Sequence, residues 1–141
     1  MIEYPIQEDL VETVSTHFVW NSDLEHLNST LTERRLLQVL EVIELEPSCS
    51  IQDLAFRVSL SPAHLQRLFK RQTGFQLGGL LAERRLRKAA ELLTVSNLSI
   101  KEIAHAVGYG HHSSFVRAFQ RRFAQAPRQY RLRPSAKGIG P

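Results

Sequence analysis

The sequence has little cysteine and no long apolar run. Its 141 residues include one cysteine, Cys49, so the chain cannot close an internal disulfide or build a zinc site from several thiols. No stretch approaches the ~18 consecutive apolar residues of a membrane span, and the N-terminus lacks a basic start followed by an apolar run. From these absences we expect a soluble, cytoplasmic protein that does not span a membrane, and its 43% apolar residues are enough for a globular core.

Lysine and arginine are absent from residues 1–31, where six acidic residues lie. From Thr32 to the C-terminus, eighteen basic residues accompany eight acidic ones, which gives a net charge of +10. A basic region of this size favours a polyanionic partner, most often nucleic acid, but a solvated basic surface would explain the charge equally well. Charge alone therefore does not decide the function.

Alternating apolar and polar runs, which are typical of strands, are also missing, and apolar residues recur instead at helical spacing. Serines at 50, 61 and 99 are expected to cap helices, and Gly74 to end one. Gly110 would precede a helix as a cap without a side chain, and Gly78 and Gly79 would each cost ~1 kcal/mol inside another. We predict an all-α fold. Its helices run from a cap at Thr32 to about 45, then over about 51–58, 62–72, 77–93, 100–107, 111–123 and 127–130, with one more at 10–20.

The chain contains an internal repeat. Residues 50–55 (SIQDLA) match residues 99–104 (SIKEIA), and beyond a short turn Arg67 and Phe69 match Arg117 and Phe119. Each copy has a short helix, a turn of three to four residues and a longer helix. The pattern therefore predicts two helix-turn-helix units, and the helix over 77–93 would connect them.

The longer helix of each predicted unit has a polar face opposite its apolar one. Arginine offers a donor fork for guanine, glutamine can pair with adenine, and alanine leaves room for a thymine methyl. For any one residue, an ordinary solvated helix face is the simpler interpretation; two such faces in a basic region favour DNA. The outward residues are Ala63, His64, Gln66, Arg67 and Lys70 in the first unit, and His112, Ser113, Val116 and Arg117, with Gln120 and Arg121 farther along, in the second.

Beyond the repeat, a set of residues recurs at characteristic spacing between Thr32 and Arg133. These residues are Leu54-Ala55, Ser61-Pro62, Leu65, Arg67-Leu68-Phe69-Lys70, Thr73-Gly74, Arg85-Leu86, Ala89, Leu92-Leu93, Ser99-Ile100, Ile103-Ala104, Val107-Gly108-Tyr109, Ser113, Phe115, Arg117, Phe119, Pro127 and Tyr130-Arg131. With them, the sequence from Thr32 to Arg133 resembles the DNA-binding region of the AraC/XylS family of bacterial transcription regulators. The sequence departs from the family at Leu80, where the family usually has tyrosine, and at Ala124, where it commonly has glycine.

The resemblance implies a seven-helix domain over 32–133, preceded by an acidic extension or linker (1–31) and followed by a flexible tail (134–141). Two homeodomain-like three-helix subdomains, with helix-turn-helix units at about 50–72 and 99–123, would place their second helices in successive major grooves. The implied base-contacting residues are Ala63, Gln66, Arg67, His112, Ser113 and Arg117. The implied phosphate contacts are Ser61, Lys70, Arg71, Gln120, Arg121, Arg128 and Arg131.

The implied function is sequence-specific regulation of transcription at the nucleoid, expected to be activation, with double-stranded DNA and RNA polymerase as partners. No cofactor or metal is expected, and the effector is not indicated. The connecting helix, at ~25 Å, is shorter than the ~34 Å between successive major-groove faces, so we expect bent DNA.

Two questions stay open. The chain could be the DNA-binding part of a larger, effector-responsive regulator rather than a small regulator controlled by its abundance. The acidic segment could bind a protein partner, shield the basic face, or pack on the first helix through Phe18, Val19 and Trp20. An enzyme is not expected, because His105 and the pair His111-His112 lack an acidic or thiol partner at metal-ligand spacing.

Overall fold

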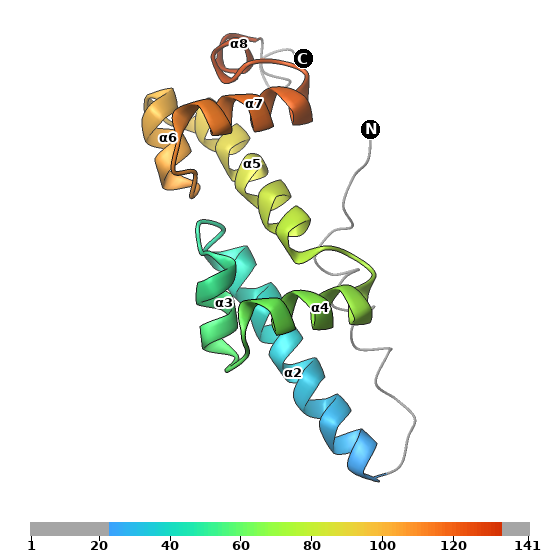
Figure 1. Ribbon diagram of the computed structural model, residues 1–141. Coiled ribbons are helices and arrows are strands. Elements are labelled where there is room, and N and C mark those ends of the chain that lie inside the picture. Colours follow the sequence, from blue (N-terminus) through green and yellow to red (C-terminus); the bar gives the residue numbers. More distant parts are fainter. Residues whose placement is uncertain (1–22, 134–141) are drawn as a thin grey trace, which may run out of the picture. The chain divides into compact units, whose positions relative to one another are not determined.

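The computed structural model describes residues 23–133, and all its regular elements there are helices (Figure 1). The predicted all-α fold is confirmed. None of the described helices is long and apolar enough to cross a membrane. The predicted helix at 10–20 and the residues Phe18, Val19 and Trp20 lie outside the described part. The helices are α2 (Asp23–Leu45), α3 (Ile51–Arg57), α4 (Pro62–Thr73), α5 (Leu77–Val95), α6 (Ile100–Ala106), α7 (His112–Phe123) and α8 (Pro127–Leu132).

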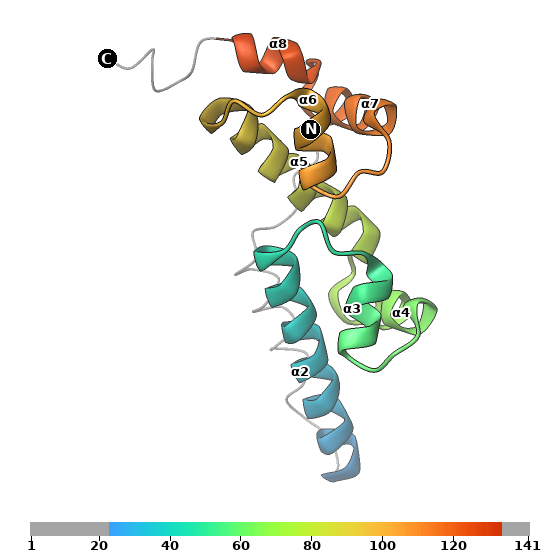
Figure 2. The ribbon, with the colours of Figure 1, turned by 90° about the vertical axis from the view of Figure 1, so that its left-hand side faces the viewer.

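The chain divides into two units, Met1–Glu83 and Arg84–Pro141, and the division falls within α5. In the first unit, α3 and α4 lie beside the C-terminal half of α2 (Figures 1 and 2). The start of α5 completes this core, because Leu77, Leu80 and Leu81 are buried in it. The other buried residues of this core are Leu36, Val39, Leu40, Val42 and Ile43 of α2, Leu54 and Ala55 of α3, Leu65, Leu68 and Phe69 of α4, and Cys49 and Val58.

The second unit has an aromatic core. Phe115 and Phe119 of α7 are fully buried, and Leu86, Ala89, Ala90 and Leu93 of α5 pack with them. The rings of Phe119 and Tyr130 meet edge to face, with centroids 5.3 Å apart, which joins α8 to α7. The small residue Ala104 of α6 is also buried in this core. Each unit thus buries its own apolar side chains, as the internal repeat predicts.

Three of the expected caps are confirmed, and they show why the helices begin where they do. The Ser50 hydroxyl accepts from the Asp53 amide at 3.0 Å, and the Asp53 carboxylate accepts from the Ser50 amide at 3.2 Å. Ser99 and Glu102 repeat this capping box at the start of α6. These bonds lower the pKa of both carboxyl groups, the backbone bond from the serine being the largest cause, so both caps weaken as pH falls toward the acidic range. Ser61 accepts from the His64 amide at 3.1 Å and caps α4.

Two predicted helix starts were wrong. Thr32 lies inside α2, which begins nine residues earlier, at Asp23, because the leucine spacing at 24, 27 and 31 continues the helical pattern past that capping residue. The cap of α7 is His111 and not Gly110. The helix still begins without a side-chain cap, as expected for Gly110, because His111 makes no side-chain cap bond. α5 also runs two residues past its predicted end, to Val95.

Two glycines at the α4–α5 connection have opposite conformational roles. Gly74 ends α4 with a φ of 81°, in the left-handed region that favours glycine. Gly78 lies in the first turn of α5, where a Cβ would touch only Ile51 Cδ1 at an ordinary 3.9 Å. The first glycine suits its backbone, and the second weakens a helix without a steric reason.

We therefore expect Gly78→Ala to raise the free energy of unfolding by about 0.5–1 kcal/mol, because alanine has less conformational entropy to lose. Gly74→Ala should lower it by about 1–2 kcal/mol, because a Cβ is strained at that φ. Urea denaturation of both variants and the parent chain measures the two effects. Destabilisation by both substitutions would contradict the assignment of Gly78.

Candidate nucleic-acid interface

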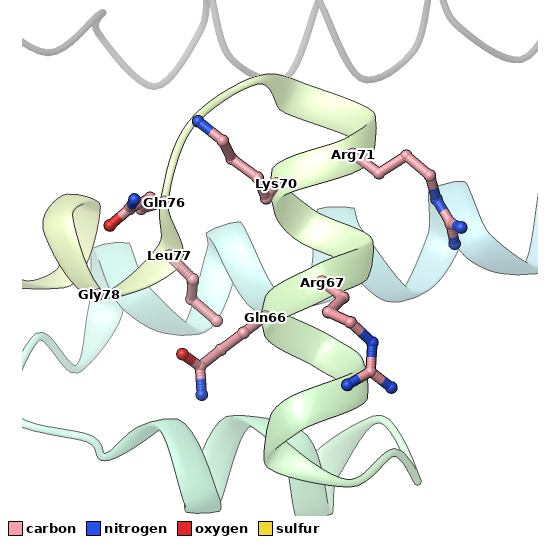
Figure 3. Close-up of a pocket in the computed structure, with 7 residues that line it drawn as sticks. All are labelled: Gln66, Arg67, Lys70, Arg71, Gln76, Leu77 and Gly78. Carbon is pink, nitrogen blue, oxygen red and sulfur yellow. The ribbon is translucent and has the colours of Figure 1, made fainter.

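The rotation of α4 about its axis is set by Leu65 and Phe69, which are both fully buried. Residues four apart lie on one face of a helix, which also includes the buried Leu68, so Gln66 and Arg67 point away from the core. The predicted base contacts Ala63, Gln66 and Arg67 are all exposed. Figure 3 shows Gln66, Arg67, Lys70 and Arg71 projecting from α4. The first unit therefore presents the polar face that the sequence predicts.

The second unit repeats this arrangement on α7. Phe115 and Phe119 are buried, and the predicted base contacts His112, Ser113 and Arg117 are exposed. Gln120 and Arg121, the predicted phosphate contacts of this helix, are exposed as well. Val116, which the sequence placed on the outward side, is only partly exposed and packs against the core.

The basic side chains of both faces lack acidic partners. The cations of these faces form no ion pair within residues 23–133, and the pairs of Arg57 with Glu46 at 3.4 Å and of Lys88 with Glu91 at 3.8 Å involve residues outside α4 and α7. Lys70 donates from Nζ to the Gly74 carbonyl at 2.9 Å, which uses one of its three donors. The Ser61 hydroxyl accepts from an amide and keeps its own proton for a ligand oxygen. Both faces can thus donate to an anion.

The described residues contain no group of three or more metal-ligating side chains, so neither His105 nor the pair at 111 and 112 belongs to one. Cys49 is buried in the first core.

Comparison with known proteins matches residues 54–133, more than half of the chain, to a family model described as a helix-turn-helix domain. A transcriptional regulator from Chromobacterium violaceum, described as having an AraC-type DNA-binding domain, superposes with a TM-score of 0.59 at 28% identity, over 74% of this chain and 97% of that one. The chain belongs to the AraC/XylS family of transcription regulators. The AraC-type domain accounts for both the internal repeat and the seven helices of the described part.

Two further AraC-type relatives are similar. The Right origin-binding protein of Escherichia coli K12 is 38% identical over 99 residues, which are 69% of this chain and 34% of that protein. The DNA-binding domain of the global transcriptional factor AdpA, solved with a target DNA, has a TM-score of 0.60 at 26% identity, over 69% of this chain and 89% of that one. The chain thus spans about a third of the length of the Right origin-binding protein.

Arg131, a predicted phosphate contact, has a different set of partners within the AraC-type fold. Its Nε donates to the Leu93 carbonyl at 3.1 Å, and an Nη donates to the Ser96 carbonyl at 3.4 Å. These bonds join α8 to the C-terminal end of α5, where helix carbonyls lack intrahelical partners. Arg128, the other predicted phosphate contact of α8, is exposed. The structure thus gives Arg131 a stabilising contact that sequence reasoning missed, and its contact with phosphate stays a prediction.

We expect Arg131→Ala to lower the free energy of unfolding by about 1–3 kcal/mol, since two charge-assisted hydrogen bonds are lost. Arg128→Ala removes the same charge from the same helix and should change stability by less than about 0.5 kcal/mol. Thermal and urea denaturation compare the two variants. Equal stabilities would show that the bonds of Arg131 contribute nothing to the second unit.

Proposed function

We propose that this chain recognises specific double-stranded DNA sequences by placing α4 and α7 in successive major grooves. The observation that carries the proposal is the repeated face: each helix buries an i, i+4 apolar pair and exposes an arginine among small and polar residues. An α-helix fits the major groove, and arginine can bind guanine with two hydrogen bonds. DNA binding by the AdpA domain in its complex supports this proposal.

The proposed readers of bases are Ala63, Gln66 and Arg67 in the first unit and His112, Ser113 and Arg117 in the second. The proposed phosphate contacts are those predicted from the sequence, and they would position the two helices without reading bases. Because the two sets of readers differ, the DNA site would consist of two unlike motifs, about one helical turn apart.

A regulator of this kind would work at the nucleoid, in the cytoplasm. We propose that it activates transcription by contact with RNA polymerase at its site; the AraC-type relatives that are named as transcriptional regulators support a role at promoters. A larger regulator with an effector-binding domain would make the same DNA contacts. Catalysis is not part of the proposal, since the family consists of transcription regulators.

Arg67→Ala and Arg117→Ala should each weaken binding to the selected site by about 1–3 kcal/mol and relax base preference in separate half-sites. Arg121→Ala should weaken binding to every sequence and reduce the salt dependence, because its proposed contact is a phosphate. Selection from a random DNA pool, followed by titrations at several salt concentrations, measures both effects. Equal losses on specific and random DNA for all three variants would refute the assignment of readers.

We also expect the bound DNA to bend. The 19 residues of α5 span ~28 Å, whereas adjacent major-groove faces of straight DNA lie ~34 Å apart. Bending the DNA toward the protein would cost a few kcal/mol of deformation free energy, which the contacts of the second unit would offset. A circular-permutation gel with the selected site measures the bend, and straight DNA in a high-affinity complex would contradict it.

A further inference from the structure

The first unit contains a pocket of about 520 Å³ between the exposed face of α4 and the start of α5. In Figure 3, Lys70 and Gln76 lie on one side of α4, and Arg67 and Arg71 extend on the other. Leu77, which is buried, contributes an apolar surface. The residues that line the pocket are Gln66, Arg67, Lys70, Arg71, Gln76, Leu77 and Gly78.

The lining has the chemistry of an anion site. Three of the seven residues are cations, two are carboxamides, and none is a carboxylate. Arg67, Lys70 and Arg71 form no ion pair with any residue of the described chain. A concave surface with this uncompensated charge attracts anions, and every polar side chain in it can donate a hydrogen bond.

Lys70 is held toward the α4–α5 turn by its bond to the Gly74 carbonyl, 2.9 Å long. That carbonyl belongs to the residue that ends α4 in the left-handed conformation. The ammonium group keeps two donors for a ligand, and the exposed side chain of Gln76 lines the same pocket. Both side chains are on the same surface as Gln66, one of the proposed base readers.

We propose that this pocket holds a backbone phosphate of the DNA, bound by Lys70 and Gln76. The proposal rests on the proposed binding of α4 to the major groove, and it adds Gln76, a residue outside the helix-turn-helix units, to the contacts. This phosphate would lie next to the half-site that Arg67 is proposed to read, because Gln66 and Arg67 line the same pocket. A phosphate at this position fixes the depth and register of α4 without reading a base.

Gln76→Glu tests the site because it replaces a carboxamide, which can donate a hydrogen bond, with a negatively charged carboxylate of nearly the same shape. We expect it to weaken binding to the selected DNA at least tenfold at low salt. Gln38→Glu is the matched control: it is the same substitution at an exposed position of α2 in the same unit, outside the pocket, and should change affinity less than twofold. Equal losses of DNA affinity in Gln76→Glu and Gln38→Glu would overturn the proposal, because the added negative charge would then weaken binding wherever it is placed on the first unit.

A second measurement replaces single DNA phosphates by neutral methylphosphonates across the site. With the parent chain, one methylphosphonate next to the half-site that Arg67 is proposed to read should weaken binding at least fivefold. With Lys70→Ala/Gln76→Ala, the same substitution should cost less than twofold, because the contact is already lost. An unchanged fivefold loss in the double variant would overturn the pocket contact while leaving sequence-specific binding intact. If the parent chain selects no sequence from a random pool, the proposed function itself fails.

Discussion

The orientation of α4 and α7 depends on burying two side chains four residues apart on each helix. Leu65 and Phe69 of α4 are fully buried, as are Phe115 and Phe119 of α7. Because each residue advances a helix by about 100°, burying such a pair leaves one rotation about the helix axis. Exposure of Arg67, which lies between Leu65 and Phe69, is therefore a consequence of core formation, and the orientation of this polar face cannot be altered independently of the fold.

Different local contacts stabilise α4 in the first unit and α7 in the second. α4 begins at the side-chain cap of Ser61 and ends at Gly74 in a left-handed conformation. α7 begins at His111 without a side-chain cap, and it ends at Ala124 with a φ of 61°, a conformation that costs a non-glycine residue about 1–2 kcal/mol. The packed rings of α7 and α8 offset this weaker local signal. Tertiary aromatic packing thus contributes more to the second unit than to the first.

The features that the sequence predicts well are local. The caps at Ser50, Ser61 and Ser99 are confirmed because each is a contact across three residues. The repeat predicts both exposed faces, although their contacts with DNA stay predictions. The role of Arg131 could not be predicted, since its acceptors lie 38 and 35 residues away. The pocket beside α4 was missed for a similar reason: its shape depends on how the turn at Gly74 sets α5 against α4.

The basic side chains fall into two groups: those whose contacts stabilise the fold, and those on the exposed faces of α4 and α7. Arg57 pairs with Glu46, Arg131 bonds to helix carbonyls, and the Arg133 guanidinium lies 4.0 Å from the Tyr130 ring centre. The cations on the faces of α4 and α7 form no ion pair with the described residues, although Lys70 donates to the Gly74 carbonyl, and their mutual repulsion opposes the compact state. A polyanion bound to both faces would remove this repulsion, so the DNA contacts proposed for these side chains would also stabilise the fold.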